Sequence, residues 1–178
     1  NAAALQASGF APANLFESAI MTTLAPGGYT AVVSGVGGLT GVGIVEVFEL
    51  DEPLNPLVNI ATRSQVLTGE NVMIAGFVIQ GDAPQEVIIR ARGPSLADFG
   101  ITDFLANPML QLFSGQAVIA ANDNWGDGGD AAFTIAARGF APTNPLESAI
   151  LLTLAPGPYT VIVSGVGGTT GVGIIEVF

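Results

Sequence analysis

The segment NDNWGDGGD, at residues 122–130, gathers the side chains of this chain that are best suited to chemistry. Ca²⁺ takes about six to eight oxygen ligands in a flexible geometry, and a glycine-rich loop rich in Asp and Asn can supply them. Calcium is therefore the one cofactor that the sequence suggests. The spacing differs from that of an EF-hand, and the alternative is a solvated turn with Asx-type hydrogen bonds and a helix cap. The candidate metal ligands are Asn122, Asp123, Asn124, Asp127 and Asp130.

The chain lacks the residues that most catalytic mechanisms require. The chain has no His and no Cys, and its four basic residues are all arginine. This composition excludes imidazole and thiolate sites, catalytic triads with a His base and Schiff-base chemistry. Glycoside hydrolysis needs two carboxyl groups that face each other across a cleft. Asp98 and Asp103, or Asp127 and Asp130, are close in sequence but lie in segments typical of solvated loops. We therefore expect no catalytic residue and no enzyme.

Two further motifs could bind anions. In SGVGGTTGVGIIEVF (164–178) the first two glycines of a nucleotide fingerprint are present, but the third position is Thr170 and a strand follows instead of a helix. A hairpin loop with close backbone packing is the better interpretation. In RARGPS (90–95), Arg90 and Arg92 lie two residues apart on one face of a strand. We expect them to pair with carboxylates.

Composition limits the partners of the protein. The net charge of −11 repels nucleic acid, because phosphate binding needs clustered Lys or Arg. Only 11% of the residues are charged and 49% are hydrophobic, so part of the surface is expected to be buried in an assembly. An acidic, glycine-rich chain without Lys or Cys is typical of a secreted, extracellular product at the cell surface.

The chain repeats itself at a fixed offset of 130 residues. Between residues 9–48 and 139–178, thirty of forty positions are identical. Such self-similarity sets the architecture. We interpret 49–178 as one complete repeat of about 130 residues, and 1–48 as the C-terminal part of a first repeat that holds about three strands. A chain that starts within a repeat favours units that propagate into a fibre.

The long uncharged stretches predict strands and not membrane helices. Twenty-eight uncharged residues lie between Glu147 and Glu176, enough to span a membrane. The stretch is broken by Pro and clustered Gly, and YTVIVSGV is β-branched and bounded by turn residues. We therefore expect no membrane span. The expected strands are 57–66, 71–81, 85–93, a hairpin in 109–123, 148–154, 159–165 and 171–178.

Few residues remain for helices. Short helices are expected at 95–108 and at 130–140, the second with Asp130 as N-cap and Gly139 at the C′ position. About eight short strands with one or two short helices predict an all-β fold, a β-sandwich of jelly-roll type.

The second half of the repeat resembles the bacterial pre-peptidase C-terminal domain. MLQLFSGQAVIAANDNWGD carries an Asn-Asp loop at Asn122-Asp123, and ESAILLTLAPGPYTVIVSGVGG carries a strand led by Ser148 and a Tyr159-Thr160 strand. Pro158 interrupts the last motif, which is intact as Gly27-Gly28-Tyr29-Thr30 in the first copy. The resemblance implies a small, non-catalytic β-sandwich of secreted bacterial proteins that is sometimes associated with calcium. The first half, 57–96, is similar to a module repeated in large bacterial surface proteins.

Two functions fit these observations. The first is a structural repeat protein that polymerises head to tail with copies of itself into an extracellular filament or surface layer, with strand complementation as a means of contact. The alternative is an accessory module that tethers a secreted enzyme or adhesin to polysaccharide or protein. The out-of-phase repeat and the apolar composition favour the first.

Overall fold

The computed structural model of the chain describes residues 2–50 and 56–178. The chain divides into two compact units, Asn1–Leu57 and Val58–Phe178. The boundary expected after residue 48 lies within the first of them. The second unit is an all-β sandwich with short helices, which confirms the predicted fold class.

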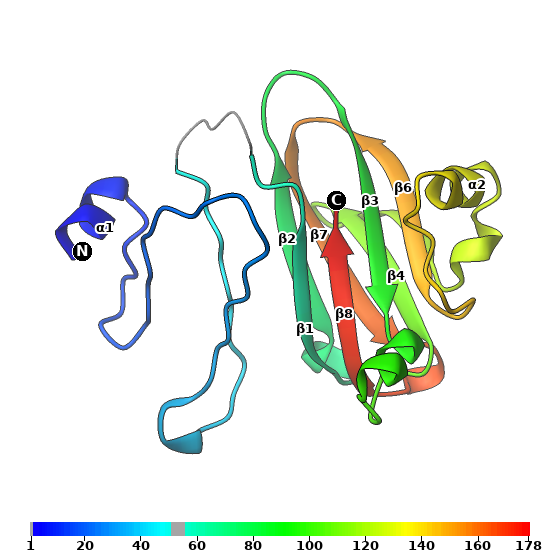
Figure 1. The fold of residues 1–178 in the computed structure, drawn as a ribbon, viewed down its shortest axis with the longest axis horizontal. Helices are drawn as coiled ribbons and strands as arrows, with labels where there is room; N and C mark the ends of the chain where they lie inside the picture. Colours follow the sequence, from blue (N-terminus) through cyan, green and yellow to red (C-terminus); the bar gives the residue numbers. More distant parts are fainter. Residues whose placement is uncertain (1, 51–55) are drawn as a thin grey trace. The chain divides into compact units, whose positions relative to one another are not determined.

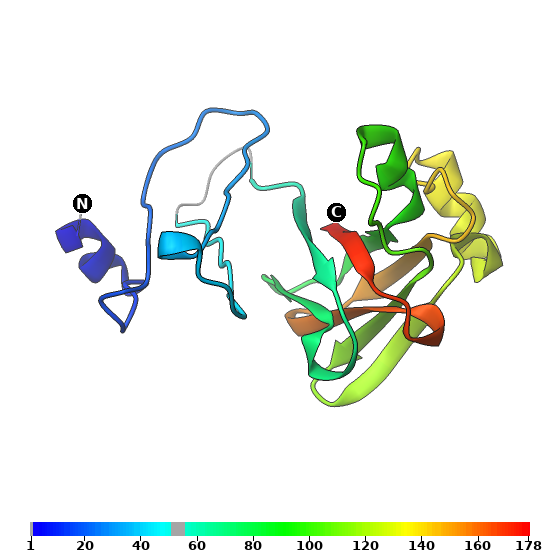
Figure 2. The ribbon, with the colours of Figure 1, turned by 90° about the horizontal axis from the view of Figure 1, so that it is seen from below.

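Two four-stranded antiparallel sheets face each other in the second unit (Figures 1 and 2). One sheet has the strand order β1-β8-β3-β6, and the other has the order β2-β7-β4-β5. Every expected strand of this unit is present, with ends shifted by a few residues at most. The strands are β1 (Ile60–Val66), β2 (Met73–Ile79), β3 (Gln85–Arg92), β4 (Pro108–Ser114), β5 (Ala117–Asn122), β6 (Ser148–Leu154), β7 (Gly157–Gly165) and β8 (Gly171–Val177).

The core is the apolar layer between the two sheets. Along β4 the side chains alternate in burial, as the pleat of a strand requires, so Leu110 and Leu112 are fully buried. They lie directly across the ladder from Val163 and Val161 of β7. Ile89 of β3 is part of the same apolar cluster, from the opposite sheet. Burial of each such side chain stabilises the fold by about 1.5–3 kcal/mol. Because these side chains come from β3, β4 and β7, the core depends on strands that are distant in the sequence.

The helix expected over 95–108 forms only in its first part, as the 3-10 helix η3 (Pro94–Phe99). Gly100 ends this helix with φ 78°. Beyond it the chain runs beside β8, where the Leu105 N–H donates to the Val172 carbonyl at 2.8 Å. The longer helix was therefore a wrong expectation, because these residues form backbone hydrogen bonds with a strand that is distant in sequence.

The second expected helix is α2 (Asp130–Ala137), which lies beside β6 (Figure 1). Its predicted C′ residue is confirmed: Gly139 has φ 78°, and the Phe140 N–H reaches back to the Ile135 carbonyl. The predicted N-cap was wrong by one position. Gly129 is the N-cap, and Asp130 is the first helical residue, where its charge favours the helix dipole. The other 3-10 helices of this unit are η2 (Gly69–Asn71), η4 (Trp125–Gly128) and η5 (Val166–Gly168).

The first unit contains α1 (Ala2–Ser8) and the 3-10 helix η1 (Val36–Gly38). Residues 2–50 contain no strand, although about three were expected there, and Figure 1 draws most of this part as an irregular trace. No helix within the described ranges is long and apolar enough to cross a membrane. Below, residues 9–48 are called the first copy, residues 139–178 the closing segment, and residues 58–138 the acceptor.

The missing strands have a physical cause. In the second unit, β6 pairs with β3, β7 pairs with β2 and β4, and β8 pairs with β1 and β3. No strand of the closing segment pairs with another strand of the same segment. The first copy has the same sequence pattern, but the acceptor at 58–138 already pairs with the closing segment, and no second acceptor is present in the part of the chain that the structure describes. Without an acceptor, its extended residues form no ladder.

Gly93 provides a test of the packing at the start of η3. A Cβ at this position would lie 2.0 Å from the backbone oxygen of Leu105. We expect Gly93→Ala to lower the free energy of unfolding by more than about 2 kcal/mol, because the crowded atom belongs to the backbone. Gly126→Ala is the matched control, since a Cβ there meets nothing within 4 Å. Chemical denaturation should separate the two variants, and equal stabilities would contradict the packing described here.

Candidate functional site

The predicted calcium loop begins at the end of β5, where Asn122 has a structural role. Its Oδ1 accepts a hydrogen bond from the Ala149 N–H at 2.9 Å, and its Nδ2 donates to the Asn124 carbonyl at 2.8 Å. Asn122 thus links β5 to β6, the first strand of the closing segment. Its side-chain oxygen is already used within the protein.

The other candidate ligands are spread along the loop. Asn124 and Asp127 are brought together, with Asn124 Nδ2 at 3.5 Å from Asp127 Oδ2. Asp127 lies in η4, and Asp130 lies in the first turn of α2. Among the described residues, no group of three or more acidic, His or Cys side chains is arranged to hold a metal ion. Calcium binding at this loop stays a prediction.

Sequence reasoning missed Glu147, the one carboxylate that is fully buried within the described ranges 2–50 and 56–178. Its Oε1 accepts hydrogen bonds from the Gly93 N–H at 3.0 Å and the Ser95 N–H at 2.9 Å. These amides belong to the start of η3, where backbone N–H groups have no partner within the helix. Glu147 Oε1 therefore joins the closing segment to the acceptor by two hydrogen bonds to backbone amides, while Glu147 Oε2 is buried without a hydrogen-bond partner.

A turn at Asn144 places Glu147 in this buried position. Asn144 Oδ1 accepts from the Leu146 N–H at 3.0 Å, and the Asn144 carbonyl accepts from the Glu147 N–H at 3.1 Å. The sequence did carry a signal for this role. Both copies place a glutamate, Glu17 or Glu147, directly before their long uncharged stretch, three residues after an asparagine.

Two arginines of the acceptor bind the last strand of the closing segment. Arg90 pairs with Glu176 at 2.7 Å, and Arg92 lies 4.0 Å from the same carboxylate. Arg92 also donates to Ser95 Oγ at 2.9 Å. This confirms the prediction that both arginines face carboxylates. At the start of β6, Ser148 Oγ donates a hydrogen bond to the carbonyl of Pro108, the first residue of β4, at 2.9 Å.

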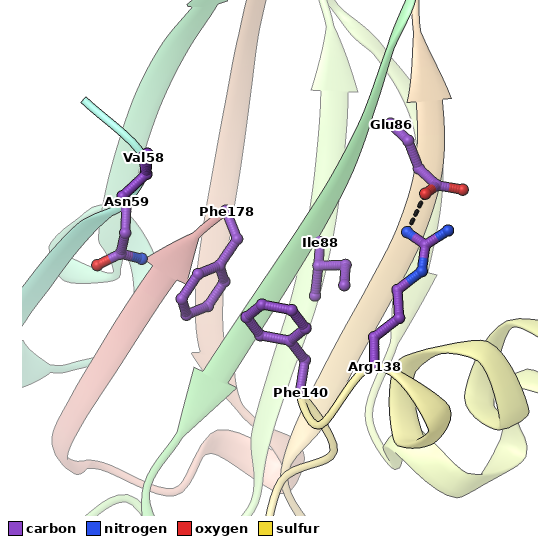
Figure 3. Close-up of a pocket in the computed structure, with 7 residues that line it drawn as sticks. All are labelled: Val58, Asn59, Glu86, Ile88, Arg138, Phe140 and Phe178. Atoms are coloured by element: carbon purple, nitrogen blue, oxygen red, sulfur yellow. Dashed lines mark hydrogen bonds and ion pairs between the residues drawn. The ribbon is translucent and has the colours of Figure 1, made fainter. Parts of the chain in front are cut away.

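A hollow of this unit lies where the two ends of the closing segment meet. Phe140 and Phe178 come together at 4.7 Å between ring centroids, and the Arg90 guanidinium lies 4.8 Å above the Phe178 ring. Figure 3 shows the two rings beside Ile88, in a cavity of about 460 Å³, with Arg138 reaching towards Glu86. The hollow is lined by aromatic and aliphatic groups and one ion pair, an arrangement that fits packing between protein segments.

Several polar groups of this unit thus link the closing segment to the acceptor. Glu147, Ser148 and Glu176 of the closing segment, and Arg90 and Asn122 of the acceptor, all form bonds across the boundary between the two. The site that these residues define is a joint between chain segments. We use the word joint for this set of contacts below.

The fold and the joint define the class of the protein as a β-sandwich module closed by a repeated segment. No family model and no curated protein matches the sequence. Among solved structures, the chain is similar to the pre-peptidase C-terminal domain of a collagenase from Bacillus anthracis, with a TM-score of 0.42 and 13% sequence identity. The match covers 67% of this chain and 89% of the collagenase domain. It is the kind of domain that the motifs in 109–178 resemble, and the likeness concerns the fold alone.

The calcium prediction can be tested on the melting temperature. If the loop binds Ca²⁺, a chelator lowers the melting temperature, and Asp123→Ala combined with Asp127→Ala removes this response. The pair Asp82→Ala and Asp98→Ala is the matched control, because it changes the net charge equally and leaves the loop intact. If neither calcium nor a chelator changes the melting temperature, the calcium prediction is wrong. Residues 122–130 are then a turn that supports the joint.

Proposed function

We propose that this protein is a non-catalytic structural repeat protein that assembles outside the cell into a filament or surface layer. The observation that carries the proposal is the first copy, a segment with the sequence of a sheet-forming element and with exposed apolar side chains. Val33 is 67% exposed whereas its counterpart Val163 is fully buried, and Ile20 is 86% exposed whereas Ile150 is 6% exposed. Apolar surface of this kind marks a protein interface.

The chemistry of the second unit supports a structural role. Its buried carboxylate and two of its four arginines are engaged in the joint. A chain without His, Cys or Lys has few of the groups that serve as bases or nucleophiles. The acidic, Cys-free composition supports an extracellular location.

Electron microscopy of the purified full chain tests the proposal. We expect filaments or ordered sheets at raised protein concentration. Ile20→Ser combined with Val33→Ser should abolish them, because it removes apolar surface from the first copy. The matched control is Val118→Ser combined with Phe133→Ser, which replaces exposed apolar side chains of the second unit and should leave assembly intact.

A chain that sediments as a stable monomer at every concentration would contradict assembly. The same holds if the control variant loses assembly while the first-copy variant keeps it. A monomer that is retained on insoluble polysaccharide would support the tethering module instead.

A further inference from the structure

The two sheets of the sandwich are built by alternation of acceptor and closing segment. Across the first sheet, β1 and β3 of the acceptor alternate with β8 and β6 of the closing segment. In the second sheet, β7 of the closing segment lies between β2 and β4 of the acceptor. Within the acceptor, only β4 and β5 pair with each other. Each part therefore needs the other to form its sheets.

The first copy already has the local conformation of the closing segment. Equivalent bonds join equivalent atoms: Tyr29 donates to the Ala25 carbonyl at 2.8 Å, and Tyr159 donates to the Ala155 carbonyl at 2.9 Å. The ends also meet, since the Phe10 and Phe48 rings are 4.3 Å apart, like the Phe140 and Phe178 rings at 4.7 Å. Further matches are the turns at Asn14 and Asn144 and the left-handed glycines Gly37 and Gly167, and Gly38 and Gly168.

The first copy lacks the contacts that an acceptor would supply. Glu17 is exposed, whereas Glu147 is buried between two donors. A Cβ on Gly171 would lie 2.5 Å from the backbone of Phe104, but a Cβ on the equivalent Gly41 meets nothing within 4 Å. The first copy thus shares local turns and ring contacts with the closing segment, while Glu17 and Gly41 lack the neighbours that Glu147 and Gly171 have in the acceptor.

We propose that the first copy is a second closing segment, and that its partner is a β1–β5 unit of the kind formed by residues 58–138. The inference rests on the proposed function and names the contact that assembly would use. By the 130-residue offset, Val32 takes the place of Ile162 opposite Ile74, and Glu17 takes the place of Glu147 at Gly93 and Ser95. Added strands of this kind bind through main-chain hydrogen bonds along their length.

The chain carries two closing segments for one acceptor. The closing segment holds the acceptor in this structure, and its core side chains are larger, with Val161 where the first copy has Ala31 and Ile175 where it has Val45. The first copy is the weaker competitor for the same acceptor. A weakened closing segment should therefore be replaced by the first copy, from the same chain or from a neighbouring one.

The exchange can be measured in the full chain by removing the two equivalent glutamates. Glu17→Ala should leave the melting temperature unchanged, because Glu17 is exposed. Glu147→Ala should lower the melting temperature and keep a cooperative transition, because the first copy replaces the damaged segment. The double variant should lose the cooperative transition. A double variant that melts like Glu147→Ala alone, or a Glu147→Ala variant that is already unfolded, would overturn the inference.

A cross-link reports the exchange directly, because the chain has no cysteine of its own. Ile74 lies opposite Ile162 in the β2–β7 ladder, and directly opposite residues of antiparallel strands are close enough for a disulfide. In the Glu147→Ala background, Ile74→Cys with Val32→Cys should form a disulfide within or between chains. Ile74→Cys with Ile162→Cys is the matched control, and should cross-link in the unaltered background and lose this cross-link with Glu147→Ala.

The inference is overturned if the Val32→Cys pair stays reduced while the Ile162→Cys pair cross-links in both backgrounds. The outcome is separate from that of electron microscopy. Exchange without filaments would contradict the proposed function alone, and filaments without exchange would contradict this inference alone.

Discussion

The structure depends on one constraint: the three strands of the closing segment pair with strands of the acceptor and not with one another. In the first sheet they are separated by β3, and in the second sheet β7 is enclosed by β2 and β4. The sheet hydrogen bonds of β6, β7 and β8 are therefore all formed with strands of the acceptor. Since unpaired strand edges are costly in water, the closing segment and the acceptor form their sheets together.

The joint adds specificity to this pairing. A buried carboxyl oxygen is costly unless it is hydrogen-bonded, and Glu147 Oε1 meets this condition only when Gly93 and Ser95 lie against it. The Arg90–Glu176 pair fixes the register of β3 against β8, because the two residues are direct partners in the ladder. Correct seating of the closing segment thus packs the core and supplies two hydrogen bonds to Glu147 Oε1 at the same time.

The sequence predicts much of the second unit, because β-branched runs between Pro and Gly turns indicate strands wherever partners exist. It failed for the first copy for the same reason: residues 18–48 have a strand-like pattern, but pairing depends on an acceptor that no local pattern can reveal. The sequence also pointed to the loop around Asn122, but it did not predict the hydrogen bond between Asn122 and Ala149. It gave no role to Glu147. Both roles arise from contacts between residues distant in the chain.

Hydrogen exchange of the unassembled full chain, followed by mass spectrometry, tests the central claim most directly, because the two copies are an internal control. We predict that amides in 148–154, 157–165 and 171–177 are protected and exchange together with those of β1, β2 and β3 in one cooperative opening. The equivalent amides in 27–35 and 41–47 should exchange without protection. Equal protection of both copies, or separate opening of the acceptor and the closing segment, would contradict the account.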